Sequence, residues 1–137
     1  MKFASALQRV VAWLIDLVIV FVLMMLLLGI GLISFLFTPG EFFFGLTTIA
    51  SMFLVIFVYT IGLETLWEGQ TVGKRALGIR AVKENGKKIK FQDALLRNIF
   101  RIIDNQLGGL VGLILIIVTK KKQRIGDFVA KTIVVQD

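Results

Sequence analysis

The stretch VVAWLIDLVIVFVLMMLLLGIGLISFLF, residues 10–37, decides the fold of this chain. Asp16 is its one charged residue. A helix needs roughly 20 predominantly apolar residues to cross the hydrocarbon core of a bilayer. The stretch therefore predicts a membrane-spanning helix over about residues 10–36. A cleaved signal peptide is a poor alternative, because the apolar region of a signal peptide has only roughly 7–15 residues.

A second apolar run follows over residues 42–63 and contains no charged residue. It is also long enough to span a bilayer. Between the two runs lies Thr38-Pro39-Gly40-Glu41, and Pro and Gly are the strongest local signals of a turn. Two spans joined by so short a turn form an antiparallel helical hairpin.

The distribution of basic residues predicts the orientation of this hairpin. Residues 10–73 contain no Lys or Arg, whereas Lys2 and Arg9 precede the first span. Nine basic residues follow the second span, up to residue 101: Lys74, Arg75, Arg80, Lys83, Lys87, Lys88, Lys90, Arg97 and Arg101. Because Lys and Arg are enriched on the cytoplasmic side, we expect a multi-pass protein of the cytoplasmic (inner) membrane with its amino terminus in the cytoplasm.

The composition agrees with a membrane protein and leaves little material for catalysis. The chain is 57% hydrophobic, and its mean hydropathy is +0.88. It has no Cys and no His, which excludes thiol nucleophiles, His-based catalysis and the usual zinc sites. The sequence therefore predicts neither an enzyme nor a bound metal or cofactor. The net charge of +7 lies beside apolar spans, so we expect contact with anionic lipid headgroups and not with nucleic acid.

The central part of the chain is too polar to span. Residues 76–90 resemble a cytoplasmic β-hairpin, because Asn85-Gly86 is a strong signal for a two-residue turn. Residues 91–104 predict an amphipathic helix, since Phe91, Leu95 and Ile99 recur at helical spacing. Such a helix can lie in the membrane interface.

A third apolar segment covers residues 107–118 and admits two interpretations. It is shorter than a normal span, which favours a re-entrant or interfacial segment. If it crossed the membrane once, the basic residues at the start of the tail, 119–137, would lie outside, against the positive-inside rule. In addition, residues 132–135 look like a strand that can pair near residues 79–82 only if both lie on one side. We therefore favour the re-entrant alternative.

Asp16 is the most informative single residue. An intramembrane carboxylate marks either an ion or proton site or an ion pair that fixes helix packing. Arg9 lies about 10 Å away along the same helix face, so each residue needs a partner elsewhere. The candidate partners are Arg97, Arg101, Asp104 and Asp127. Glu64, at the end of the second span, is a further candidate for this charge network, although interfacial solvation explains it as well.

The segment from Gly69 to Lys74 loosely resembles a phosphate-binding loop. Its glycine spacing is short by one residue, and Arg75 stands where that loop needs Ser or Thr. We therefore expect no nucleotide site, and we interpret the glycines as turning the chain out of the membrane.

The chain resembles the RDD family of membrane proteins, named for one arginine and two aspartates. Four ordered motifs carry the resemblance: Arg9-Val-Val-Ala-Trp-Leu-Ile-Asp16, residues 69–82 (GQTVGKRALGIRAV), Arg97-Asn98 with Arg101 and Asp104, and Gln123-Arg-Ile-Gly-Asp127 followed by residues 132–135. Val72 departs from the family, which commonly has Pro there.

The resemblance assigns the family's arginine and first aspartate to Arg9 and Asp16. The second aspartate is Asp104 or Asp127, and the tight Arg-Ile-Gly-Asp motif favours Asp127. The resemblance also implies a single membrane domain over residues 1–137 and transport of unspecified ligands.

Two function hypotheses follow. In the first, the chain is a transport component for a monovalent cation or proton that acts as a homo-oligomer, because two or three spans cannot enclose a pathway alone. In the second, it is a scaffold or accessory subunit that transports nothing. Its charges then only lock the helices, and its basic face binds lipid or a partner. In both, the fold is mainly α: a spanning hairpin, a cytoplasmic β-hairpin, an amphipathic helix and a short third apolar segment.

Overall fold

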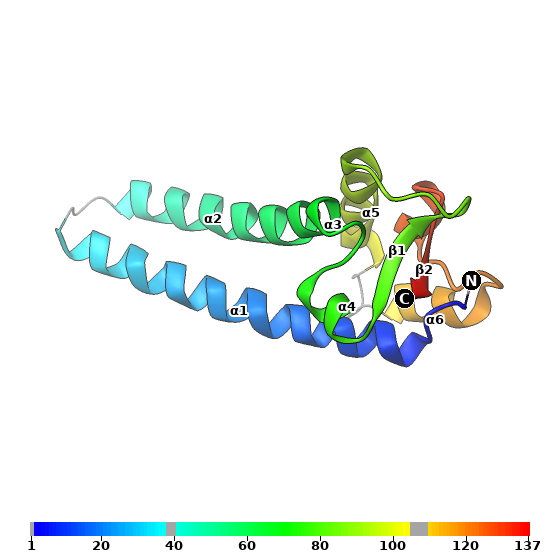
Figure 1. The fold of residues 1–137 in the computed structure, drawn as a ribbon. Coiled ribbons are helices and arrows are strands. Elements are labelled where there is room, and N and C mark those ends of the chain that lie inside the picture. Colours follow the sequence, from blue (N-terminus) through cyan, green and yellow to red (C-terminus); the bar gives the residue numbers. More distant parts are fainter. Residues whose placement is uncertain (1, 38–40, 105–109) are drawn as a thin grey trace.

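The computed structural model describes residues 2–37, 41–104 and 110–137, without the side chains of residues 34, 36, 37, 41–44, 46 and 102–104. The protein is mainly helical, with one small two-stranded sheet. A long helical hairpin extends from one side, and the shorter elements gather at the open end of the hairpin with both chain termini (Figure 1). The predicted turn at residues 38–40 lies outside the described residues.

The first arm of the hairpin is α1, Ala6–Phe37. It begins four residues before the predicted span, because Ser5 and Gln8 form a reciprocal capping box. The Gln8 N–H donates to Ser5 Oγ at 3.1 Å, and the Ser5 N–H donates to Gln8 Oε1 at 2.9 Å. This exchange satisfies two backbone donors at the helix start.

The second arm is not a uniform α-helix. It consists of α2, Glu41–Phe57, a π-helical turn, Val58–Gly62, and α3, Leu63–Leu66. A π turn holds an extra residue and often occurs at functional positions. Here it buries three consecutive side chains, Tyr59, Thr60 and Ile61.

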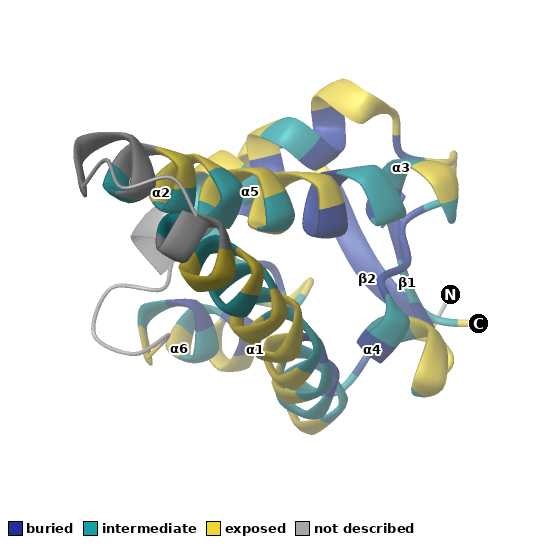
Figure 2. Ribbon diagram, turned by 90° about the vertical axis from the view of Figure 1, so that its left-hand side faces the viewer, coloured by how far each residue is buried: buried dark blue, intermediate teal, exposed yellow. Residues whose placement is uncertain are grey.

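In the described part of the chain, two helical segments are long and apolar enough to cross a membrane: Ala6–Ile33 and Thr47–Leu66. Both expose many large apolar side chains, as Figure 2 shows along α1 and α2. Leu26 and Phe53, for example, are 60% and 72% exposed. Soluble proteins rarely expose apolar surfaces this large. The exposed side chains are those expected of helices that lie in the hydrocarbon of a bilayer.

The sheet joins the middle of the chain to its end. Strand β1, Ile79–Lys83, pairs antiparallel with β2, Thr132–Gln136, in the register Ala81 opposite Val134. The expected pairing of residues 132–135 with residues 79–82 is therefore correct. It also means that the chain after α6, Leu110–Val118, lies at the same end of the hairpin as the chain after the second arm (Figure 1).

The predicted β-hairpin over residues 76–90 is wrong in part. Ala76 ends a short helix, α4, Val72–Ala76. The turn is present, since Gly86 has a φ of 80° and its N–H donates to the Lys83 carbonyl at 2.8 Å. The returning arm makes only the isolated bridge between Val82 and Lys88, because the next helix, α5, begins at residue 91 and leaves too few residues for a strand.

Helix α5, Phe91–Asp104, has the range expected from the sequence, but its polar face points inward. Asp93 and Arg97 are buried, whereas Leu96 and Ile99 are 39% and 50% exposed. Charged side chains are almost never buried unless they are paired. The inverted arrangement therefore indicates that α5 faces a charged interior on one side and an apolar environment on the other.

The remaining elements are short. Helix α6 has nine described residues, a length of about 14 Å, which is less than half of a hydrocarbon core of about 30 Å. The predicted third segment, 107–118, begins outside the described residues. Helix α7, Ile125–Val129, packs against α5 and leads into β2. The apolar core beside the sheet contains Ala4, Ala12, Ile61, Ile79, Ala81, Ile89, Ala94 and Val134.

Candidate functional site

Asp16 is buried, with 6% of its surface exposed, and it binds three uncharged donors. The Tyr59 hydroxyl and the Gly73 N–H donate to its Oδ1 at 2.7 and 2.8 Å, and the Thr71 hydroxyl donates to Oδ2 at 2.6 Å. Buried polar groups are stable only when they are hydrogen-bonded. The donor set therefore explains how a carboxylate is held inside a candidate spanning helix.

Two of these donors come from the segment that superficially resembles a phosphate loop. Thr71 is the N-cap of α4 and accepts a hydrogen bond from the Lys74 N–H at 3.4 Å. Gly73 lies directly on α1: a Cβ at this position would stand 2.1 Å from the Ala12 carbonyl oxygen. The glycine is needed because only a residue without a side chain brings its N–H this close to Asp16.

Gly69 has the turning role that the sequence suggested for the glycines. Its φ is 96°, and a Cβ there would stand 2.0 Å from the Ala81 carbonyl oxygen. The Ala81 N–H donates to the Gly69 carbonyl at 2.9 Å. The turn therefore fixes α4 between α1 and the sheet.

Asp127 is surrounded by arginines. Arg9 NH1 donates to its Oδ2 at 3.0 Å, Arg97 Nε donates to Oδ1 at 3.0 Å, and Arg97 NH2 lies 3.0 Å from Oδ1 in an ion pair. The Arg124 N–H donates to Oδ2 at 3.3 Å, and the Arg124 Nε lies 3.8 Å from the same oxygen. Asp127 is 1% exposed, so this ion cluster lies in the interior.

Glu64 extends the ion cluster toward the second arm. It forms an ion pair with Lys74, and its Oε2 lies 3.8 Å from Arg97 NH1. The Asn98 amide donates to the same oxygen at 3.5 Å. Arg97 therefore links Glu64 and Asp127, so that α3, α4, α5 and α7 meet at one charge network.

The electrostatics of the network follow from burial and pairing. Burial alone would raise the pKa of Asp127, but the three neighbouring arginines outweigh it and hold this pKa well below its usual range. Burial lowers the pKa of Lys74 to about 8, although the pairing with Glu64 opposes the shift. The pairing with Glu64 thus compensates only part of the cost of burying the Lys74 charge.

Arg101 is the least compensated of these cations. Its NH1 reaches only Asn98 Oδ1, at 3.5 Å, and no ion pair is found for it among the described side chains. Burial and, next, the charge of Arg124 lower the pKa of Arg101 to about 10. The side chain of Asp104 lies outside the described residues.

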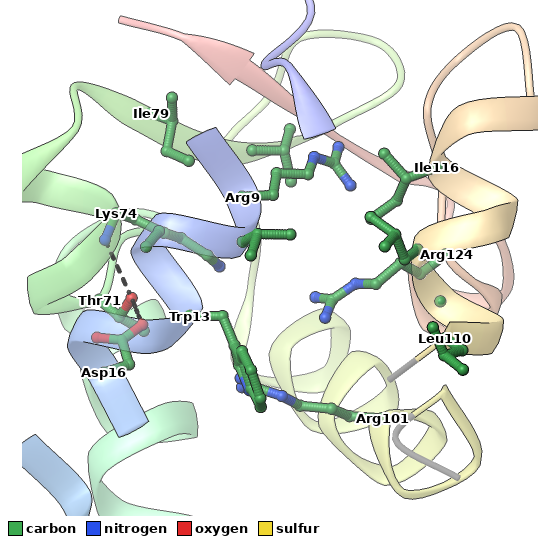
Figure 3. Close-up of a pocket in the computed structure, with 15 residues that line it drawn as sticks. Arg9, Trp13, Asp16, Thr71, Lys74, Ile79, Arg101, Leu110, Ile116 and Arg124 are labelled. Carbon is green, nitrogen blue, oxygen red and sulfur yellow. Dashed lines mark hydrogen bonds between the residues drawn. The ribbon is translucent and has the colours of Figure 1, made fainter. Parts of the chain in front are cut away.

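A cavity of about 170 Å³ lies between these elements (Figure 3). Its charged lining residues are Arg9, Asp16, Lys74, Arg101 and Arg124. In Figure 3, Lys74 and Arg124 extend from opposite sides toward its centre, and Trp13 of α1 and Arg101 of α5 also line it. Four basic groups and one carboxylate thus face a single space.

Four of the predicted site residues lie in or beside the charge network, and Asp16 lies apart from it. Arg9 and Asp16 lie on α1 but have no binding partner in common, in agreement with their expected separation. Asp127, one of the proposed partners, pairs with Arg9. Glu64 and Arg101 lie at the edges of the same network.

Sequence reasoning did not assign Tyr59, Thr71, Gly73, Lys74 and Arg124 to the site. Tyr59 is the one tyrosine of the chain, and it follows an apolar run in which its hydroxyl is unusual. The other four lie within two of the motifs quoted for the resemblance, which was the available signal. No group of three or more acidic, His or Cys side chains that could hold a metal ion is found within the described residues.

Comparisons with known proteins agree with the motif pattern. The model of the RDD family matches residues 3–131. An uncharacterized protein of Bacillus subtilis (strain 168), YckC, is 39% identical over 90 residues, which cover 61% of this chain and 60% of YckC. The chain thus spans less than two thirds of the length of this relative. No solved structure matches the chain. Because the family model covers nearly the whole sequence, the chain belongs to the RDD family.

Proposed function

We propose that this protein is a transport component of the cytoplasmic membrane that acts as a homo-oligomer and moves a proton or couples to one. The observation that carries the proposal is Asp16, a buried carboxylate in a candidate spanning helix, in the wall of a cavity. Ionisable groups in spanning helices mark ion pathways and proton relays. Two spanning helices cannot enclose a pathway, so a second copy must complete it.

A proton suits Asp16 better than a metal cation. A hard cation takes several oxygen ligands, whereas both Asp16 oxygens already accept hydrogen bonds from Tyr59, Thr71 and Gly73. A proton needs only one oxygen lone pair, which becomes available when one hydroxyl donor rotates away.

The neighbouring ion cluster would control access to Asp16. Arg9 is on the same helix as Asp16 and is held by Asp127 of α7. Release of Arg9 from Asp127 would let the end of α1 move relative to α7 and open the cavity to the cytoplasm. Arg9 and Asp127 then act as a gate, whereas Asp16 carries the proton.

Ion flux into proteoliposomes tests this proposal. The wild type and Asp16→Asn are reconstituted at equal density, and an internal pH dye follows proton movement under an imposed gradient of pH or monovalent cation. Wild-type flux that disappears in a folded Asp16→Asn protein is the expected result. Equal flux in the two proteins would refute the role of Asp16.

We further propose that the charged end faces the cytoplasm and that α6 is re-entrant. The support is the length of α6, nine residues, and the pairing of β1 with β2 at one end of the hairpin. Because the chain has no Cys, single cysteines at Lys87 and Lys121 can be labelled with an impermeant thiol reagent. Both are expected to react only from the cytoplasmic side, and opposite sides for the two would exclude a re-entrant α6.

The alternative function is that of a membrane scaffold or accessory subunit. The observation that favours it is that Asp16, Glu64 and Asp127 all have partners in place, as purely structural charges do. On this alternative, wild-type protein moves no ions in any gradient, and Asp16→Asn lowers only the yield of folded protein.

A further inference from the structure

The cavity carries more positive charge than its carboxylates neutralise. It is lined by four basic side chains from four elements: Arg9 of α1, Lys74 of α4, Arg101 of α5 and Arg124 at the start of α7. Asp16 is the one acidic residue among its described lining residues, and its oxygens accept hydrogen bonds from Tyr59, Thr71 and Gly73. An anion that enters the cavity therefore meets cations whose counter-charges lie elsewhere.

Arg9 shows the deficit most directly. One of its nitrogens, NH1, binds Asp127, but Nε and NH2 are buried without a hydrogen-bond partner among the described residues. The side chain of Arg9 is only 8% exposed, so water reaches these donors poorly. A buried donor that remains unsatisfied in a native protein calls for an explanation, and a bound ion is one of the recognised explanations.

Arg101 and Arg124 add a second indication. Arg101 has no ion pair among the described side chains, and Arg124 carries a charge close enough to lower the pKa of Arg101. Two like charges that line one cavity repel each other. An anion between them removes this repulsion and supplies the missing acceptors.

We infer that the cavity is a binding site for a phosphoryl group, held by Arg9, Arg101 and Arg124 with Lys74 at its edge. Guanidinium groups recognise phosphate through paired, charge-assisted hydrogen bonds. The volume of about 170 Å³ is several times the roughly 30 Å³ that a water molecule occupies in the liquid, so a phosphoryl group fits. The site does not depend on transport and exists equally in a scaffold.

Two sources supply this chemistry: free phosphate and the headgroup of an anionic phospholipid. Arg9 lies at the start of the first candidate spanning segment, the depth at which headgroups lie. Basic pockets at the cytoplasmic ends of spanning helices commonly bind such headgroups. The experiment below separates the two sources.

Trp13 lines the cavity and serves as the reporter. The chain has two tryptophans, and Trp67, which packs against Arg75, is replaced by Phe so that fluorescence reports on Trp13 alone. The full chain is purified in detergent and titrated with inorganic phosphate at constant ionic strength, with chloride as the replaced anion. A second arm compares nanodiscs of phosphatidylglycerol with nanodiscs of phosphatidylcholine.

Arg101→Gln is the test variant, because it removes a cation that has no ion pair among the described side chains and leaves the ion pairs of those residues in place. Its anion affinity is expected to fall about tenfold or more, the effect of one lost charge-assisted hydrogen bond. Its unfolding temperature without phosphate is expected to equal or exceed that of the wild type. Arg124→Gln, expected to weaken binding likewise, is the second variant. Arg80→Gln is the matched control, since Arg80 lies on the surface, 35% exposed, beside Asp137.

A saturable Trp13 signal with phosphate identifies free phosphate as the source. A signal confined to phosphatidylglycerol discs, lost in Arg101→Gln and kept in Arg80→Gln, identifies the headgroup. The inference is overturned if neither arm exceeds its chloride or phosphatidylcholine reference, or if Arg80→Gln weakens binding as much as Arg101→Gln does.

Discussion

Asp16 and Asp127 are the same side chain in opposite surroundings. Both are buried. Among the described residues, Asp16 accepts hydrogen bonds only from uncharged donors, whereas Asp127 binds Arg9, Arg97 and Arg124. The uncharged donors around Asp16 carry no positive charge that the carboxylate must neutralise. The arginines around Asp127, which we call the arginine shell, do need its negative charge, because loss of the carboxylate removes a counter-charge that these cations share. The comparison indicates that Asp127 is required as the counter-charge of its arginines, whereas Asp16 forms no ion pair among the described residues.

The largest expected effect is that of Asp127→Asn. The substitution keeps the size of the side chain but leaves Arg9 buried without its counter-charge and leaves Arg97 with Glu64 alone. Removal of one partner from a buried ion pair typically costs about 3–5 kcal/mol, which is comparable with the total stability of many small domains. We expect a severe loss of monodisperse protein in detergent, measured by size-exclusion chromatography and thermal unfolding.

Glu68→Gln is the control for this prediction. Glu68 is 45% exposed and pairs on the surface with Lys88 and Arg80. Exposed ion pairs contribute little, so the yield and the unfolding temperature are expected to stay near wild-type values. If Asp127→Asn were as stable as Glu68→Gln, the arginine shell would not depend on the carboxylate, and the comparison would fail.

The next largest effect is expected for Gly73→Ala, which acts on the Asp16 side. The new Cβ would stand 2.1 Å from the Ala12 carbonyl oxygen, so α4 must move away from α1. Overpacking of this kind costs about 1–3 kcal/mol, and the hydrogen bond from the Gly73 N–H to Asp16 is lost as well. Thermal unfolding measures the effect.

Gly29→Ala is the matched control, because it makes the same chemical change in α1 at a position with nothing within 4 Å. Alanine is a better helix former than glycine, so this variant is expected to be at least as stable as the wild type. An equal loss in the two variants would show that the close approach of α4 does not matter.

The sequence predicts the hairpin well, because an apolar run reports its environment locally. The length of the run around Asp16 and the absence of basic residues up to residue 73 are sufficient to identify two candidate spanning helices. The strand pairing between residues 79–82 and 132–135 was also predictable, from β-branched residues and from the requirement that both lie on one side.

Other features depend on long-range packing and were not predictable. The π turn that places Tyr59 beside Asp16 leaves no periodic signal in a uniformly apolar segment. The amphipathic pattern of α5 predicts a helix but does not determine which face points inward. The polar face with Arg97 is buried because Arg97 pairs there with Asp127 and Glu64. The need for glycine at Gly73, the second residue of α4, comes from the close approach of Ala12, which lies far away in the sequence.

A smaller effect is expected for Tyr59→Phe, which removes one of the three donors to Asp16. Thr71 and Gly73 still satisfy the carboxylate, so the cost is about 1–2 kcal/mol, less than for Gly73→Ala. Thermal unfolding gives the value, with Thr65→Val as the control, because the Thr65 hydroxyl bonds only to the Ile61 carbonyl. A loss of stability as large as that of Asp127→Asn would mean that Thr71 and Gly73 alone do not satisfy the Asp16 carboxylate.

The smallest effect is expected for Arg124→Gln and concerns how much stability the protein loses at acidic pH. The pKa of Asp127 is held well below its usual range, since its arginines outweigh burial. The resulting stability is present above the unfolded-state value of about 3.9 and is lost as the pH falls toward the folded-state value. In Arg124→Gln one of the three cations is gone, so this pKa lies closer to its usual range. The variant should therefore lose less stability than the wild type between neutral pH and pH values below about 3.9, measured as the change in unfolding temperature. A steeper loss in the variant would mean that Arg124, whose side chain is 22% exposed, does not stabilise the charged form of Asp127, and that Arg9 and Arg97 alone hold it.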